Sequence, residues 1–229
     1  MAKYKVGTSK HWDGATVFWQ IDYHNRVRTG KIMLYNPTTG KRIKEPYNHV
    51  TWVHSVLHKD NYNLKQCFFG EHLLSEDKSR PVALVESEKT ALIASYHLPQ
   101  FLWIASGGKN GCFNANSLSV LAGRSVVLFP DLGATTIGKA NRLMKSYGID
   151  VQLFDYLEAK ATESERKEGY DIADYLLKVR PDEAILQQMI KRNPNLKTLI
   201  ETFDLKLINV QRGISQSKVS PPKKRGFKL

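Results

Sequence analysis

The sequence has few cysteines and no long apolar run, and both absences exclude classes of protein. Cys67 and Cys112 are the only cysteines among 229 residues, and they form no C-x-x-C pair. A disulfide scaffold and a Cys-rich zinc ribbon are therefore excluded, and a reducing cytoplasm is the expected location. No stretch is apolar over the roughly 20 residues that a membrane span needs, and the polar start Met1–Lys5 is unlike a signal peptide. We expect no membrane partner.

Acidic side chains are scarce toward both ends of the chain, whose net charge is +12. Residues 1–78 carry 12 basic and 7 acidic side chains, residues 79–178 carry 11 of each, and residues 179–212 carry 6 and 4. Residues 213–229 carry 5 basic side chains and no acid, in a stretch rich in Ser, Pro and Lys that predicts a disordered basic tail. A neutral centre between basic flanks favours a polyanionic partner, DNA or RNA.

Two short apolar strands each end on a carboxylate. Val82–Val85 is followed by Glu86 and then by a predicted helix, and the strand Arg124–Asp131 closes on its own acid before a predicted helix at Thr136–Ser146. The carboxyl ends of parallel strands meet at one edge of a sheet, where α/β proteins bind ligands. We therefore expect Glu86 and Asp131 to lie together.

A third pair of acids, Asp171 and Asp174, lies in the stretch GYDIADYLL. Together with Glu86 and Asp131 these residues would form a carboxylate cluster from three turns, the donor set that Mg²⁺ (or Mn²⁺) requires. An acid in the first turn of a helix is also an ordinary cap, so Asp171 and Asp174 have a purely structural alternative.

The N-terminal part predicts a small antiparallel meander. Strands are expected at Thr16–Tyr23 and Arg26–Tyr35, with Gly30 as a bulge, a turn at Asn36–Gly40, and a mobile lead-in over residues 1–12. The basic side chains of the meander are a candidate nucleic-acid face, although a solvated sheet face has the same pattern. The candidates that we select are Arg28, Lys31, Lys41 and Arg42.

A glycine-containing turn, Ser106–Gly111, follows the predicted strand Phe101–Ala105. Glycines let backbone N–H groups approach a phosphate, and Lys109 would reach the same group. A tight turn without a ligand is the alternative.

Six of the seven histidines precede residue 73. His54 and His58 would share a face of a helix and could ligate zinc with Cys67 or His72. The spacing matches no established zinc pattern, so packing and surface roles are the expectation.

The central segments resemble the Toprim domain, the metal-binding fold of bacterial-type DNA primases, topoisomerases and some nucleases. Val85-Glu86 resembles the start of the V-E-G motif, with Ser87 in the glycine position. Phe129–Gly133 resembles the D-x-D motif in its first acid, Asp131, while Gly133 stands where the second is expected. Asp171 falls where primases carry a late acid. The missing acid predicts a weak second metal site, unless Glu88, Asp155 or Asp174 replaces it.

The N-terminal part is similar to the subdomain that precedes Toprim in the primase catalytic core. The matching segments are Phe18–Asp22 and Phe68–Gly70, and the words WQID, GKIMLY and FGEHLL also occur in uncharacterised Toprim proteins of Bacteroidetes mobile genetic elements. The resemblance implies a mostly parallel Toprim-like α/β sheet flanked by helices, preceded by a small β-rich subdomain. The predicted boundaries are 1–78, 79–178, 179–212 and 213–229.

For function, the resemblance implies primase-like, Mg²⁺-dependent nucleotidyl transfer in DNA replication or mobile-element metabolism. Glu86 would act in acid–base chemistry and in metal binding, with Asp131 catalytic and Asp131 and Asp171 as further metal ligands. The alternatives are a metal-dependent nuclease and a degenerate binding module. The sequence holds no Walker A loop and no zinc-binding domain. Recognition of single-stranded or primed DNA would then need the basic tail, or a helicase or zinc-binding module on another chain.

Overall fold

The computed structural model describes residues 2–108, 112–134, 137–178 and 181–205. It divides into two compact units, Met1–Lys178 and Val179–Leu229. The candidate residue Lys109 and the predicted tail at 213–229 lie outside the described residues. The finer boundaries at 78/79 and 212/213 stay predictions.

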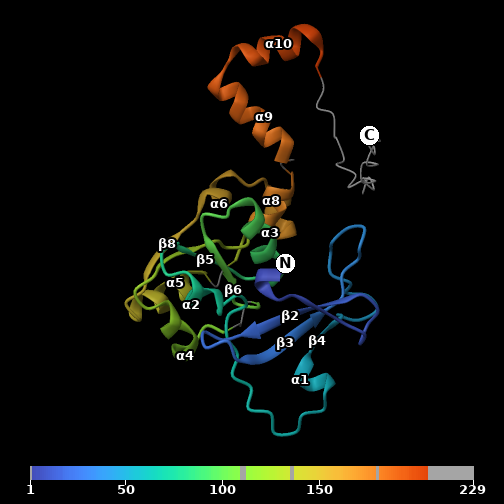
Figure 1. Cartoon of the computed structure of the whole chain (residues 1–229), viewed down its shortest axis with the longest axis vertical. Coiled ribbons are helices and arrows are strands. Elements are labelled where there is room, and N and C mark those ends of the chain that lie inside the picture. Colours follow the sequence, from blue (N-terminus) through green and yellow to red (C-terminus); the bar gives the residue numbers. More distant parts are fainter. Residues whose placement is uncertain (1, 109–111, 135–136, 179–180, 206–229) are drawn as a thin grey trace, which may run out of the picture. The chain divides into compact units, whose positions relative to one another are not determined.

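The first unit begins with an antiparallel sheet of four strands in the order β1-β2-β3-β4 (Figure 1). These strands are Gly7–Ser9, Ala15–Ile21, Val27–Met33 and Val50–Trp52. The expectation of a mobile lead-in over residues 1–12 is wrong, since part of that segment forms β1 and a 3-10 helix, η1 (Ala2–Tyr4), precedes it. Tyr4 is buried and its hydroxyl donates to the carbonyl oxygen of Trp103 at 2.9 Å. This contact fixes the start of the chain against the second sheet.

Gly30 is not a bulge, and its glycine has a steric reason. It pairs directly with Trp19 in the β2–β3 ladder, and the register shifts instead at the Gln20–Ile21 step. A Cβ atom on Gly30 would lie 2.9 Å from side-chain atoms of Trp19, Val17 and Val53. That separation is shorter than van der Waals contact, so only glycine lets these side chains pack over β3.

The second sheet is parallel throughout, in the order β6-β5-β7-β8. Its strands are Val82–Val85 (β5), Leu102–Ala105 (β6), Ser125–Leu128 (β7) and Asp150–Leu153 (β8). Every residue of β5 and β6 is buried, as expected where helices cover both faces of a sheet. The predicted fold class is confirmed: a mixed α/β chain whose four-stranded parallel sheet is flanked by helices and preceded by a small antiparallel sheet.

Short helices connect the strands and end the first unit. They are α1 (Val53–Val56), α2 (Leu73–Glu76), α3 (Glu88–His97), α4 (Ala115–Leu118), η2 (Ser119–Leu121), α5 (Ile137–Ser146), α6 (Tyr156–Lys160), α7 (Glu163–Glu168) and α8 (Ile172–Lys178). Helix α3 packs against β5, β6 and α8, and α5 packs against β8. The second unit holds α9 (Pro181–Arg192) and α10 (Asn195–Phe203), which pack on each other. No helix in the described part of the chain is long and apolar enough to cross a bilayer.

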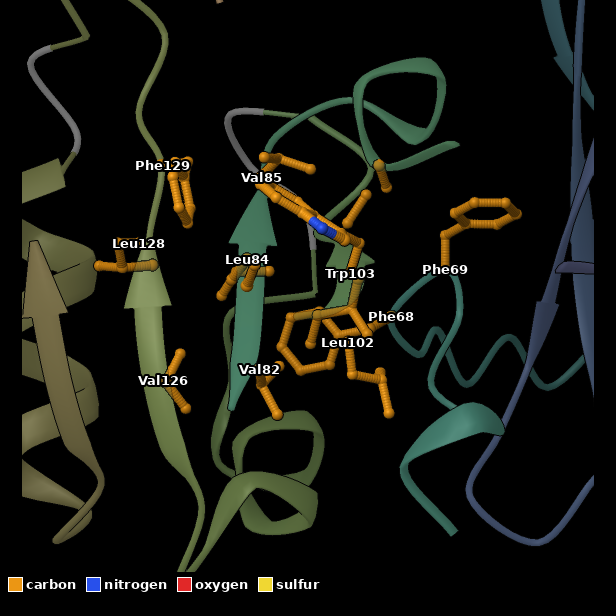
Figure 2. Packing of buried hydrophobic residues seen from close by; sticks show 14 of the residues in the cluster. Phe68, Phe69, Val82, Leu84, Val85, Leu102, Trp103, Val126, Leu128 and Phe129 are labelled. Carbon is orange, nitrogen blue, oxygen red and sulfur yellow. The ribbon is translucent and has the colours of Figure 1, made fainter. Parts of the chain in front are cut away.

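One hydrophobic core joins the two sheets of the first unit. Figure 2 shows Phe68 and Phe69 beside side chains of the parallel strands, among which is Trp103 of β6. Phe69 also forms an antiparallel bridge with Ala105, the last residue of β6, through hydrogen bonds of 2.9 and 3.0 Å. The segment before β5 therefore extends the parallel sheet at its β6 edge.

Candidate functional site

A pocket of about 690 Å³ lies at the carboxyl ends of β5 and β7. These strands are neighbours in parallel register, with Leu84 opposite Leu128. Glu86 directly follows β5, and Asp131 lies three residues beyond the end of β7. Both line this carboxylate pocket, as do Asp171 and Asp174. The structure thus brings together the acids of all three predicted turns.

Among the described residues, cations and acids balance on the wall of the carboxylate pocket. Its six acids are Glu86, Glu88, Asp131, Glu168, Asp171 and Asp174. Its six cations are Lys31, Lys41, Arg42, Lys44, Lys89 and Lys178. Of these, Lys44, Lys89 and Lys178 are not among the residues predicted from the sequence. Lys44 is in the same basic run as Lys41 and Arg42, which is a usable signal, whereas nothing local distinguishes Lys178.

Lys31 links the antiparallel sheet to the carboxylate pocket. Its Nζ lies 3.2 and 3.4 Å from the two carboxylate oxygens of Glu88 and donates to the carbonyl oxygen of Gly107 at 2.7 Å. The Glu88 side chain is 3% exposed and the Lys31 side chain 13%. A buried ion pair of this kind holds both partners in place, so Lys31 must exchange partners before it can contact a phosphate.

Asp171, which lines the carboxylate pocket, caps α8. Its Oδ1 accepts from the backbone N–H groups of Ala173 and Asp174, and the Asp174 carboxylate accepts from the Asp171 N–H at 3.0 Å. The hydroxyl of Thr90 on α3 donates to Oδ2. Burial raises the pKa of Asp171, an effect that the Thr90 bond opposes. With both oxygens bonded, Asp171 is anchored as a helix cap at the edge of the site.

The basic candidates from the sequence do not form one face. Lys41 and Arg42 are exposed on the wall of the carboxylate pocket, which Lys31 also lines. Arg28 lines a different pocket and pairs with Asp22 at 2.7 Å. Lys109 lies outside the described residues.

The acids of the carboxylate pocket do not form a closed cage for a metal ion among the described residues. Among the described residues, no three His, Cys, Asp or Glu side chains lie close enough to share one metal ion. Within that same part of the chain nothing bonds the Glu86 carboxylate, whereas Glu88 and Asp171 are bonded as above. Mg²⁺ commonly binds through one or two carboxylates and completes its shell with water and substrate phosphate. Glu86 and Asp131 can supply such carboxylates.

The zinc alternative finds no support in the local backbone. Helix α1 ends at Val56, and His58 has a positive φ of 47°, so His54 and His58 do not share a helical face. The His54 ring bonds the hydroxyl of Thr29 at 2.8 Å. Cys67 and His72 are buried. Cys67 and His72 therefore have packing roles, whereas His58 is exposed.

Gly133, where the resemblance predicts a second acid, has a left-handed backbone with φ of 70°. Its N–H donates to the carboxylate of Glu158 at 3.3 Å. Of the three proposed replacements for that acid, Glu88 and Asp174 line the carboxylate pocket, whereas Asp155 does not. The left-handed backbone favours glycine here.

A family model described as "Domain of unknown function (DUF6371)" matches residues 1–132, which is more than half of the chain. The chain belongs to this family. The match covers the antiparallel sheet and the parallel strands as far as Asp131, so the DUF6371 region includes Glu86 and Asp131 but not Asp171.

None of the curated proteins matches this DUF6371 member. Among solved structures it is similar to the crystal structure of the Aquifex aeolicus primase, comprising the zinc binding and RNA polymerase domains, with 13% identity and a TM-score of 0.44. The similarity covers 81% of this chain and 45% of that chain, so the DUF6371 member spans less than half of the primase structure.

Proposed function

We propose that this protein catalyses Mg²⁺-dependent phosphoryl transfer on nucleic acid, as a primase-like nucleotidyltransferase of the Toprim type. The carrying observation is that Glu86 and Asp131 follow neighbouring parallel strands and line one pocket with six cations. Carboxylates for a metal beside cations for phosphates are the parts that such chemistry needs. The Toprim-like motifs around Glu86 and Asp131 support the same proposal.

The roles follow from what each side chain can contact. Glu86 and Asp131 would hold the metal through carboxylate oxygens, and Mg²⁺, when bound, would supply the positive charge that offsets charge on a transferred phosphoryl group. Lys41 and Arg42 are exposed on the same wall and would hold the phosphates of the strand. Glu86 would also accept the proton of the attacking hydroxyl, since no described residue bonds its carboxylate.

A second candidate is a nucleic-acid-binding module without catalysis. It is favoured by Gly133 in the place of the second acid and by the bonds that engage Glu88 and Asp171. Two-metal catalysis needs carboxylates for both ions, and two acids are few for that purpose.

The test supplies the purified protein with single-stranded DNA or RNA and with primed strands. Each reaction contains nucleoside triphosphates and Mg²⁺ or Mn²⁺, and the products are resolved by length. New oligonucleotides support a primase, and shortened strands indicate a nuclease. The absence of both products, together with strand binding that Asp131→Asn leaves unchanged, would favour the binding module.

We expect Asp131→Asn and Glu86→Gln each to lower turnover at least about hundredfold, because each removes a carboxylate from the metal site. Asp150→Asn is the matched control, because Asp150 is exposed and lines neither large pocket. Excess EDTA should abolish turnover of the parent protein. Full activity in EDTA, or an equal loss in Asp150→Asn, would contradict the proposal.

A further inference from the structure

A second pocket, of about 760 Å³, lies at the other end of β7. Arg124, on its wall, directly precedes β7, whereas the carboxylate pocket lies where that strand ends. The two pockets share no lining residue among those described. The volume of this second pocket falls in the range of about 300–1,000 Å³ that is typical of small-molecule sites. We call it the arginine pocket.

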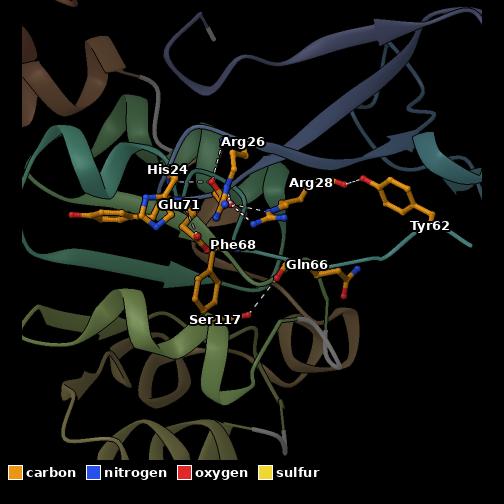
Figure 3. Close-up of polar contacts among 10 residues, drawn as sticks. His24, Arg26, Arg28, Tyr62, Gln66, Phe68, Glu71 and Ser117 are labelled. Atoms are coloured by element: carbon orange, nitrogen blue, oxygen red, sulfur yellow. Dashed lines mark hydrogen bonds and ion pairs between the residues drawn. The ribbon is translucent and has the colours of Figure 1, made fainter. Parts of the chain in front are cut away.

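Asp22 orients two arginines at this pocket, Arg26 and Arg28, and both arginines are labelled in Figure 3. Its Oδ1 accepts from the backbone N–H groups of His24 and Arg26, each at 3.0 Å, which fixes the turn between β2 and β3. Its Oδ2 accepts from Nε of Arg26 at 2.9 Å and from Nε of Arg28 at 2.7 Å. One buried carboxylate therefore holds two guanidinium groups side by side.

Both arginines keep N–H groups for a ligand. A guanidinium has five donors, and the bonds to Asp22 use Nε of Arg26 and Nε and Nη2 of Arg28. The Arg26 side chain is 60% exposed and that of Arg28 is 24% exposed. Their remaining N–H groups can bind phosphate oxygens in the forked geometry typical of arginine.

Glu71 also lines the arginine pocket and fixes the backbone around it. This buried carboxylate accepts from the backbone N–H groups of Tyr23 and Phe68, both at 3.0 Å. It therefore ties the β2–β3 turn to the segment before α2, and Figure 3 shows Glu71 beside Phe68. A pocket held in this way loses little conformational freedom when a ligand binds.

Positive charge dominates the arginine pocket, unlike the carboxylate pocket. The acids on its wall are Asp22 and Glu71, and the cations are Arg26, Arg28, Lys65, Lys78 and Arg124. The guanidinium of Arg124 donates to the carbonyl oxygens of Leu74, Asp77 and Arg80, so it is structural. Four cations still face two carboxylates, which favours an anion.

We propose that the arginine pocket binds a phosphate group, held by Arg26 and Arg28, from a nucleotide or from the backbone of a nucleic-acid strand. The site needs no metal and is separate from the carboxylates proposed for catalysis. It goes beyond the proposed function and does not depend on it.

The test measures binding to the full chain in EDTA. Inorganic phosphate and ATP are titrated by calorimetry, and a fluorescein-labelled single-stranded oligonucleotide is titrated by anisotropy. Arg26→Ala should weaken binding about tenfold, as expected for loss of one charge-assisted contact. Arg142→Ala is the matched control, because Arg142 is exposed on α5 and lines neither pocket.

Each outcome decides the proposal. Weaker binding of ATP and phosphate in Arg26→Ala identifies a nucleotide as the source, and weaker binding of the oligonucleotide alone identifies a strand. Equal affinities in Arg26→Ala and Arg142→Ala, or no binding of any probe, would overturn it. Lys78→Ala, at an exposed residue of the same wall, provides a second variant if Arg26→Ala unfolds. Because the assay has no metal and no turnover, failure of the catalytic proposal would not change its result.

Discussion

Asp22 is the residue on which the geometry of the arginine pocket depends. Its side chain is 8% exposed and bonds two arginines and two backbone N–H groups. Burial alone raises the pKa of Asp22, but the hydrogen bonds from Arg26 and Arg28 outweigh burial and lower it overall. The ionised carboxylate therefore contributes to folding stability as well as to the shape of the pocket.

We predict that Asp22→Asn lowers the free energy of unfolding by about 1–3 kcal/mol at pH 7, since it removes the charge from two bonded pairs. A carboxylate with a depressed folded pKa adds stability above its unfolded pKa, about 3.9, and loses it as the pH falls through the folded value. The difference between parent and variant should therefore shrink below about pH 4. Urea unfolding at pH 7, 5 and 3 checks this, and a gap that does not change with pH would contradict it.

The Asp22–Arg28 pair and the Lys31–Glu88 pair differ in how far the sequence could predict them. Asp22 and Arg28 lie six residues apart across a predicted hairpin, so their pairing was accessible from the strand pattern. Lys31 and Glu88 are 57 residues apart and belong to different sheets. Their contact depends on how the sheets pack, which no local pattern contains. The strand pattern places Arg28 and Lys31 on the predicted meander, but it does not indicate Glu88 as the partner of Lys31.

The parallel strands were the most predictable elements. Val82–Val85 was placed with its observed bounds, because a fully buried strand has a continuous apolar run and Glu86 ends it. Strand β1 was missed because Gly7–Ser9 is short and polar. It is held by pairing with β2 rather than by its own propensity. Gly30 was assigned to a bulge because a glycine in a strand has two meanings, and only the packed neighbours distinguish them.

At Gly30, we predict that replacement by Ala destabilises the antiparallel sheet. The added methyl group would overlap Trp19, Val17 and Val53, and overpacking of this kind costs about 1–3 kcal/mol. Thermal unfolding should show a Tm several degrees lower, by about 3 °C or more. The double variant Gly30→Ala, Val53→Ala should recover part of the loss. An unchanged Tm in Gly30→Ala would show that this packing is wrong.

On the scale of the whole molecule, the residues that precede β5 protect the β6 edge of the parallel sheet. Phe69 bridges Ala105, and Tyr4 bonds the carbonyl oxygen of Trp103 on the same strand. Phe68 and Phe69 also belong to the core that surrounds β5 and β6. An open sheet edge with exposed apolar side chains is prone to pair with other chains.

We therefore predict that residues 79–178 expressed alone aggregate, whereas residues 1–178 stay monodisperse. Size-exclusion chromatography of both fragments at matched concentration measures this difference. A monomeric and cooperatively unfolding 79–178 fragment would show that the parallel sheet does not need the preceding segment.

Among the described residues, acids and cations are equal in number around the carboxylate pocket, and this equality has a consequence for what can enter it. A bare polyanion would meet as much repulsion as attraction there, whereas a cation and a phosphate that arrive as a neutral couple disturb neither set. The carboxylate pocket should therefore prefer a ligand that carries both charges. Ionic strength has little influence on the binding of a ligand without net charge. The arginine pocket has a surplus of guanidinium and ammonium groups, so its affinity for an anionic ligand should instead fall as the salt concentration rises.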